Sequence, residues 1–220
     1  MILAIFDIDG TICDSREVEG ACFAKAVEAI TGTALSTLDW AKYPEPTSSG
    51  VVRKLLDGDP EARQKESEIK TEFCRLLGNA RRSHPQEFKP ISGVPSFIKR
   101  LQDERIARVA IATGCFDDEA RFKLACCGMD MDEFPHATSS DTPRRRDILP
   151  LAASRAGAAI SDTVYFGDAP WDLVVSRALP VDMIGIGRRI EELTALGLEH
   201  TFADFRDDDG ILDVISNLTA

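Results

Sequence analysis

The sequence lacks any long apolar run. No stretch approaches the roughly 18 apolar residues that a transmembrane helix needs. The opening segment, MILAIFDIDG, has no basic leader before Asp7, so we expect neither a signal peptide nor a membrane anchor. We therefore expect a cytoplasmic protein with no membrane partner.

Basic residues are in short supply. The chain has 26 Lys and Arg against 37 Asp and Glu, which gives a formal net charge of -11. Such a surface repels polyanions, so we expect no nucleic-acid partner. If the substrate is an anion, cations placed locally in the binding site must overcome this field.

Cysteine patterns that bind metals are also absent. None of the six cysteines forms a CxxC or a Cys/His metal spacing, which favours reduced thiols that mostly fill the core. Cys13 and Cys115 lie beside conspicuous motifs, yet no paired histidine indicates thiol catalysis.

What is present is an alternation of strand-like and helix-like segments. The 220 residues are 44% hydrophobic, enough for one core domain that carries an insertion. The alternation predicts an α/β fold with a parallel sheet flanked by helices. The expected strands are Leu3–Phe6, Ala107–Ala112, Ala137–Ser139, Thr163–Phe166 and Asp182–Ile186. The expected helices of this part are Val94–Glu104, Asp118–Cys126, Arg145–Ala156, Trp171–Ala178, Arg189–Leu196 and Gly210–Leu218.

One segment breaks the alternation. Residues 16–89 show helical periodicity, clearest at Glu17–Ile30 and Thr71–Leu77, and no convincing strand. Its middle, Tyr43–Gly50, is expected to be a loop because it is rich in proline and small polar residues. We predict a helical insertion at 16–89 within a core made of residues 1–15 and 90–220.

An acidic pair follows the first expected strand directly. Asp7 and Asp9 point to the same side of an extended chain, and Gly10 permits a tight turn beside a ligand. Two carboxylates this close repel each other, so they require a divalent cation or a shared proton.

Other polar side chains follow the strands that we expect nearby. Thr113 and Gly114 offer a hydroxyl and backbone N–H groups to an anion, and Asp168 and Asp172 add two carboxylates. Ligands of open parallel sheets bind at the carboxyl ends of the strands, where these residues should meet. Such hard oxygen ligands suit Mg²⁺, and one arginine of the run 144–146 can supply a cation.

Four sequence elements now resemble the motifs of the haloacid dehalogenase-like hydrolase superfamily: DIDGT, the Thr113 strand end, a basic residue before a helix, and GDAPWD. The resemblance covers nearly the whole chain. It implies a Rossmann-like core and, for an insertion after the first motif, an α-helical cap domain over the site.

The resemblance also implies roles for single residues. Asp7 would be the nucleophile and a metal ligand, and Asp9 the acid/base that offers its backbone carbonyl to the metal. Thr113 would bind phosphate. Asp168 would complete the metal site, and Asp172 would support it through water or by orienting neighbours.

The third motif departs from the family. Many relatives carry Lys-Pro before the helix, whereas here Pro143 precedes three arginines. We take Arg144 as the expected phosphate-binding cation and Arg145 as the reserve. The planar, forked guanidinium binds oxyanions in pairs, so the local geometry must differ from that around a lysine.

These features lead us to expect a Mg²⁺-dependent phosphatase that hydrolyses a small phosphorylated metabolite through an aspartyl-phosphate. Relatives that cleave carbon–halogen bonds lack the second acid, so Asp9 favours phosphoryl transfer. Two alternatives stay open: a phosphotransferase or sugar-phosphate mutase, and a non-catalytic regulatory protein that keeps the fold. The substrate, the arginine that serves as cation and the oligomeric state are not fixed by the sequence.

Overall fold

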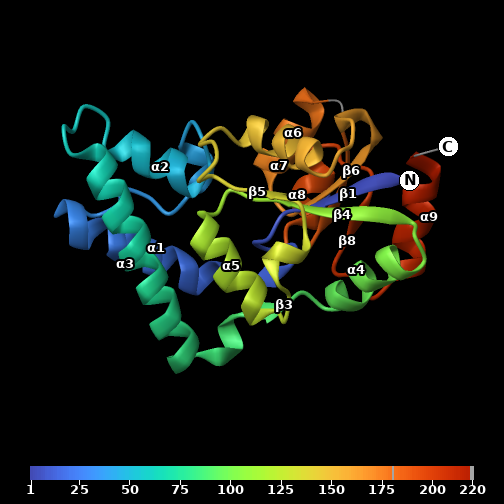
Figure 1. Cartoon of the computed structure of the whole chain (residues 1–220), viewed down its shortest axis with the longest axis horizontal. Coiled ribbons are helices and arrows are strands. Elements are labelled where there is room, and N and C mark those ends of the chain that lie inside the picture. The colour runs from blue at the N-terminus through green and yellow to red at the C-terminus, as the bar shows by residue number, and fades with distance from the viewer. Residues whose placement is uncertain (180, 219–220) are drawn as a thin grey trace.

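A six-stranded parallel sheet forms the centre of the molecule (Figure 1). The structure, a computed structural model, describes residues 1–179 and 181–218. The strand order is β5-β4-β1-β6-β7-β8, and every neighbouring pair is parallel. The strands are β1 (Ile2–Phe6), β4 (Ala107–Ala112), β5 (His136–Ala137), β6 (Thr163–Gly167), β7 (Asp182–Ile186) and β8 (Thr201–Phe202). The predicted Rossmann-like α/β fold is confirmed.

Strand β1 separates two apolar layers. Its side chains alternate, so that Ala4 and Phe6 join one buried cluster and Leu3 and Ile5 join the other. The first cluster includes residues of α4 (Val94–Asp103), α5 (Asp117–Cys126) and α9 (Asp208–Leu218). The second includes residues of α6 (Arg145–Arg155), α7 (Pro170–Ala178) and α8 (Ile190–Ala195). Burial on both faces explains why β1 reads as a continuous apolar run.

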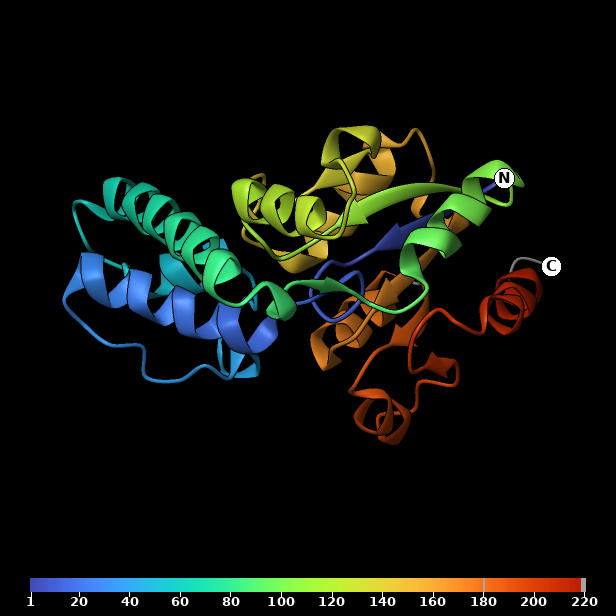
Figure 2. The same cartoon turned by 90° about the horizontal axis from the view of Figure 1, so that it is seen from below.

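The inserted segment forms a helical cap beyond one end of the sheet (Figure 1, Figure 2). Its helices are α1 (Arg16–Thr31), α2 (Ser48–Leu55) and α3 (Ala62–Ser83). They enclose their own apolar cluster, in which the rings of Phe23 and Phe73 meet edge to face with centroids 5.3 Å apart. The chain enters the cap through β2 (Cys13–Asp14) and returns through β3 (Lys89–Pro90), which pair antiparallel. No helix among the described residues is long and apolar enough to span a membrane.

The short strands β2, β3 and β8 were not expected from the sequence, and α3 is longer than the expected helix Thr71–Leu77. Two other segments also differ from the expectation. The expected loop at Tyr43–Gly50 contains the start of α2, because the Thr47 hydroxyl accepts a hydrogen bond from the N–H of Gly50 at 2.9 Å and caps the helix. The expected strand Ala137–Ser139 is only His136–Ala137. It ends there because the N–H of Thr138 donates to the Asp141 carboxylate at 2.9 Å in a local turn.

Candidate active site

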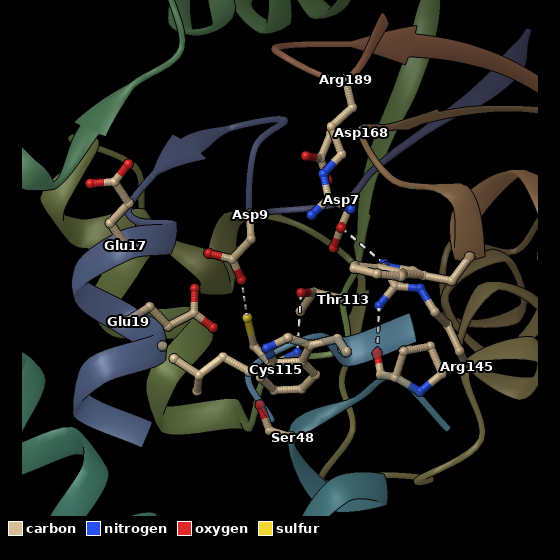
Figure 3. A pocket seen from close by; sticks show the side chains of 16 residues that line it. Asp7, Asp9, Glu17, Glu19, Ser48, Thr113, Cys115, Arg145, Asp168 and Arg189 are labelled. Carbon is tan, nitrogen blue, oxygen red and sulfur yellow. Dashed lines mark hydrogen bonds and ion pairs between the residues drawn. The ribbon is translucent and has the colours of Figure 1, made fainter. Parts of the chain in front are cut away.

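The carboxyl ends of β1, β4 and β6 open into a cavity of about 430 Å³ between the sheet and the cap (Figure 3). The core contributes Asp7, Asp9, Thr113, Gly114, Cys115, Arg145, Asp168, Trp171 and Arg189 to its wall. The cap contributes Glu17, Glu19, Gly20, Leu38, Trp40, Pro46 and Ser48. The structure therefore brings the residues that follow three different strands to one site, with the cap as its roof.

Asp7 lies at the end of β1 and is buried. Its Oδ2 accepts a hydrogen bond from Arg145 Nη2 at 2.9 Å, while its Oδ1 has no hydrogen-bond partner among the described residues. Burial raises the pKa of Asp7 to about 7; the charge of Arg145 opposes this shift and that of Asp172 adds to it. A buried carboxylate oxygen without a donor is suited to a cation or to a reacting group.

Arg145 connects Asp7 with Asp172. Its Nε donates to Asp172 Oδ1 at 2.9 Å, and Asp172 also accepts from the Tyr165 hydroxyl at 2.8 Å and from the backbone N–H of Ala169 at 3.1 Å. Asp172 therefore holds Arg145 and the loop after β6 in one arrangement.

The guanidinium that reaches Asp7 belongs to Arg145 and not to Arg144, which was the expected cation. Arg144 is exposed and has an extended backbone at the N-cap of α6. Arg145, the first residue of the helix, is buried and its side chain points into the cavity (Figure 3). Because α6 begins at Arg145, this side chain and not that of Arg144 points inward and contacts Asp7.

Asp7, Asp168 and Asp172 bring carboxylate oxygens within 4.8 Å of one another. Gly10 allows this approach, since a Cβ there would lie 2.2 Å from Asp168 Oδ2, and its φ of 76° disfavours other residues. Together with the unpartnered Asp7 Oδ1, this oxygen-rich set fits a hard divalent cation such as Mg²⁺.

Thr113 and Gly114 follow β4 and face the cavity. Thr113 is buried, and its Oγ1 accepts from the N–H of Cys115 at 3.3 Å. A Cβ at Gly114 would lie 2.5 Å from Arg145 Nη1, so glycine leaves room for the guanidinium. The Gly114 carbonyl accepts from the N–H of Ser48 at 2.8 Å, which ties the cap to this loop.

Asp9 has its own set of partners. Its Oδ1 accepts from the Ser15 hydroxyl at 3.0 Å, and its Oδ2 accepts from Lys123 Nζ at 2.7 Å and from Cys115 Sγ at 2.9 Å. Burial alone would raise the pKa of Asp9, but Lys123 and Cys115 together hold it below its ordinary value. The side chain of Asp9 is thus directed away from the carboxylates of the Asp7 group.

Sequence reasoning missed Lys123 and its partners Glu119 and Glu19. Lys123 is fully buried, and Glu119 and Glu19 are also buried. The only signal in the sequence was a Glu119–Lys123 pair four residues apart on a helix, a spacing that usually indicates an exposed ion pair. Trp40 and Leu38 of the cap were also missed, because no pattern assigns cap side chains to the wall of a site.

Comparisons with known proteins agree with this geometry. A family profile described as haloacid dehalogenase-like hydrolase matches residues 4–186. A hydrolase from Pseudomonas syringae superposes with a TM-score of 0.77 and 23% identity, covering 98% of this chain and 99% of that one. CbbY from Rhodobacter sphaeroides, solved with phosphate, gives a TM-score of 0.72 and 17% identity over 93% and 95%. A beta-phosphoglucomutase from Clostridium difficile gives 0.76 and 14% over 99% and 98%. No protein with curated annotation matches the sequence.

The matched region extends from β1 to the end of β7. It contains Asp7, Asp9, Thr113, Arg145 and Asp168, which the fold gathers around one cavity. The similar structures share the fold over nearly their whole length. The chain belongs to the haloacid dehalogenase-like hydrolases.

Proposed function

We propose that the protein is a Mg²⁺-dependent phosphohydrolase that acts on a small phosphorylated metabolite. The observation that carries this proposal is the buried Asp7, which lines the cavity: its Oδ1 has no donor among residues 1–179 and 181–218, and Arg145 holds its other oxygen. The second acid, Asp9, lines the same cavity. This combination suits a nucleophile with a separate proton carrier, as phosphate ester hydrolysis through a covalent intermediate requires.

Asp7, Asp168 and the backbone carbonyl of Asp9 would hold Mg²⁺. When bound, the ion supplies positive charge that stabilises the phosphoryl group during transfer. The fit rests on the cluster of carboxylate oxygens and on the unpartnered Asp7 Oδ1. Asp172 takes no direct part, because its oxygens accept from Arg145, Tyr165 and the loop backbone.

The side chains divide the reaction between them. Asp7 attacks phosphorus and forms the aspartyl-phosphate as the ester bond breaks. Asp9 in its protonated form, which its low pKa makes a minor but strongly acidic species, gives its proton to the departing oxygen. Asp9 then takes a proton from the water that attacks the aspartyl-phosphate, which releases phosphate and regenerates Asp7. The Thr113 hydroxyl, the Gly114 N–H and Arg145 stabilise the charge on the phosphoryl oxygens.

The cavity and the cap set the class of substrate. A volume of about 430 Å³ with a roof from α1 and the segment before α2 admits a small molecule and excludes polymers. We divide the chain into a catalytic core, residues 1–15 and 90–220, and a cap, residues 16–89. The cysteines are free thiols, which supports the cytoplasm as the compartment.

A phosphotransferase or mutase is the second candidate. It is favoured by the similarity to a structure named beta-phosphoglucomutase, with a TM-score of 0.76. The two activities differ in whether the aspartyl-phosphate passes its phosphoryl group to water or to a second hydroxyl of a sugar. A mutase would convert one sugar phosphate into its isomer without net release of phosphate.

The decisive experiment is a phosphate-release screen against some dozens of phosphorylated metabolites. We expect Mg²⁺-dependent turnover of at least one of them, and a loss of at least about 10⁴-fold in Asp7→Asn, since the nucleophile is removed. Asp57→Asn, at an exposed position of the cap, is the matched control and should retain wild-type activity. Full activity of Asp7→Asn, or full activity in excess chelator, would contradict the proposal.

A further inference from the structure

Lys123 of α5 places a buried ammonium group beside Asp9. Its side chain has no solvent exposure, and its Nζ lies 2.7 Å from Asp9 Oδ2, 2.7 Å from Glu119 Oε1 and 3.0 Å from Glu19 Oε2. Figure 3 shows the Asp9 carboxylate directed toward Cys115 and Glu19. The proposed reaction as described above makes no use of Lys123.

A purely structural role explains this arrangement poorly. Removing an ammonium from water is costly, and an apolar side chain of similar length would fill the same space without that cost. The aliphatic stem of a lysine usually leads the charged head to the surface. Here the head ends instead at the candidate acid/base, surrounded by carboxylates from three different segments of the chain.

The number of partners fixes the orientation of the group. An ammonium has three N–H donors and no acceptor, and three carboxylates lie within reach of Lys123 Nζ. The donor that faces Asp9 cannot rotate away without breaking a bond to Glu19 or Glu119. Ser15 holds the second oxygen of Asp9 at 3.0 Å, so both oxygens of the carboxylate have defined partners.

The same cluster connects Asp9 to the cap. Glu19 belongs to α1, and the hydroxyl of Ser48, at the start of α2, donates to Glu119 Oε2 at 2.9 Å. The cap thus contacts the Lys123–Glu119 pair at two places. Displacement of the cap would remove Glu19 from Lys123 and Ser48 from Glu119.

We propose that Lys123 is a positioning residue that fixes the carboxylate of Asp9 for proton transfer, and that Glu19 and Glu119 hold Lys123 in place. This inference rests on the proposed phosphohydrolase function. It assigns to the cap, through Glu19, a part in orienting the acid/base as well as in covering the cavity.

The test separates proton transfer from general damage by using two phosphate esters. Values of kcat/KM, which report the steps up to departure of the leaving group, are measured for an alkyl phosphate and for 4-nitrophenyl phosphate. In Lys123→Met we expect a loss of about 10²- to 10³-fold for the alkyl ester, which needs a proton on its leaving oxygen. For the nitrophenyl ester, whose leaving group departs as a stable anion, we expect a loss of less than about tenfold. Equal losses for both esters, or no loss, would overturn the inference.

Two further variants keep the test decisive. Arg121→Met changes a cation on the same helix that pairs with Asp117 and Asp132 at the surface, and should leave both kcat/KM values unchanged. Glu19→Met retains Lys123 and removes the cap carboxylate that contacts both Lys123 and Asp9, while Ser48 keeps its contact with Glu119. In this variant kcat/KM for the alkyl ester should fall about tenfold, with a smaller loss for the nitrophenyl ester. If the ratio of the two kcat/KM values stays as in the wild type, the inference is contradicted, and this result holds even if Lys123→Met fails to fold.

A measurement without turnover distinguishes this inference from the proposed function. Amide hydrogen exchange in residues 9–19 should accelerate at least about tenfold in Lys123→Met or Glu19→Met and stay unchanged in Arg121→Met. If the wild-type protein hydrolyses none of the screened phosphate esters, the proposed function fails, and exchange alone decides whether Lys123 holds this segment. Exchange that does not respond to either variant would show that Lys123 does not restrain Asp9.

Discussion

Asp7 and Asp9 follow the same strand, two residues apart, but their side chains contact different partners. Asp7 meets Arg145, which is held by Asp172, and all three belong to the core. Asp9 meets Lys123, which is also bound by Glu19 of the cap. The pKa of Asp7 is raised to about 7 chiefly by burial, whereas that of Asp9, despite burial, is held low by Lys123 and its other donors. The cap reaches both aspartates at one remove: Glu19 binds Lys123 beside Asp9, whereas Glu45 accepts at 3.2 Å from the backbone N–H of Arg145 beside Asp7. The contact near Asp9 is a buried ion pair, and the contact near Asp7 is a backbone hydrogen bond.

Among the variants that test this difference between Asp7 and Asp9, we expect Arg145→Met to have the largest effect on stability and activity. The substitution leaves the buried carboxylates of Asp7 and Asp172 without their shared cation. We expect the free energy of unfolding to fall by about 3–5 kcal/mol, because uncompensated buried charges remain. We expect kcat to fall by about 10³-fold, because a fixed positive charge beside the phosphoryl group is lost. Denaturant unfolding and steady-state kinetics measure the two effects.

Arg144→Met is the matched control for this prediction. Arg144 is the neighbouring residue and is exposed at the N-cap of α6. Its replacement should change the free energy of unfolding by less than about 0.5 kcal/mol. Comparable losses in both variants would mean that the cation facing Asp7 had been wrongly assigned.

The second prediction concerns how the stabilisation of the protein by Mg²⁺ depends on pH. The raised pKa of Asp7 favours its protonated form, a contribution to stability that is fully present below the ordinary value of 3.8 and is lost as pH rises through about 7. A bound cation must displace this proton at low pH but not at high pH. We therefore expect excess Mg²⁺ to stabilise the protein by about 1–2 kcal/mol more near pH 8 than near pH 5.5, measured by thermal unfolding. In Asp7→Asn this difference between the two pH values should disappear.

A smaller effect is expected at the contact between the cap and the Asp9 cluster. Ser48→Ala removes the hydroxyl that donates to the buried Glu119 Oε2, which keeps its hydrogen bond from the N–H of Phe116. We expect a loss of about 1–2 kcal/mol in unfolding free energy, typical of a hydrogen bond to a charged group. Ser67→Ala, at an exposed position of α3, should have no measurable effect. Equal stabilities of the two variants would show that this contact does not hold the cap.

The smallest effect is expected at Cys115. Burial first, and then the charge of Asp9, raise the pKa of this thiol well above its ordinary value, so it stays protonated and is not a nucleophile. Serine can make the same hydrogen bond to Asp9 Oδ2. Cys115→Ser should therefore change kcat by less than about threefold. Loss of all activity in this variant would require a direct chemical role for the thiol.

The sequence was sufficient where local pattern and sheet topology act together. The strands β4 and β7 begin and end where predicted, and β1 and β6 are one residue longer. Because parallel strands bring their carboxyl ends to one edge, the order of the strands and the residues that follow them predict a common site for Asp7, Thr113 and Asp168. These residues do face one cavity.

The sequence was insufficient to predict which side chains of a helix point into the protein. Arg144 and Arg145 are neighbours, and which of them points inward depends on the residue at which α6 begins, a boundary that patterns fix only to within one or two residues. The Glu119–Lys123 spacing is the same for an exposed and a buried pair. Only the fold of the cap, which places Glu19 of α1 beside Lys123 of α5, surrounds the pair with other groups and makes it internal.

The insertion of the cap directly after the first strand has a consequence for biosynthesis. Ile2 of β1 pairs with Ala107 and Leu3 pairs with Thr163, so both neighbours of the central strand are made long after it. Most apolar contacts of α1, α2 and α3 are made among residues of the inserted segment and can form while the ribosome is still producing the rest of the core. Until β4 and β6 emerge, the apolar segment of β1 has two unpaired edges and is exposed to association with other chains. The order of synthesis thus leaves the strand that precedes Asp7 and Asp9 without its partners until most of the chain has been made.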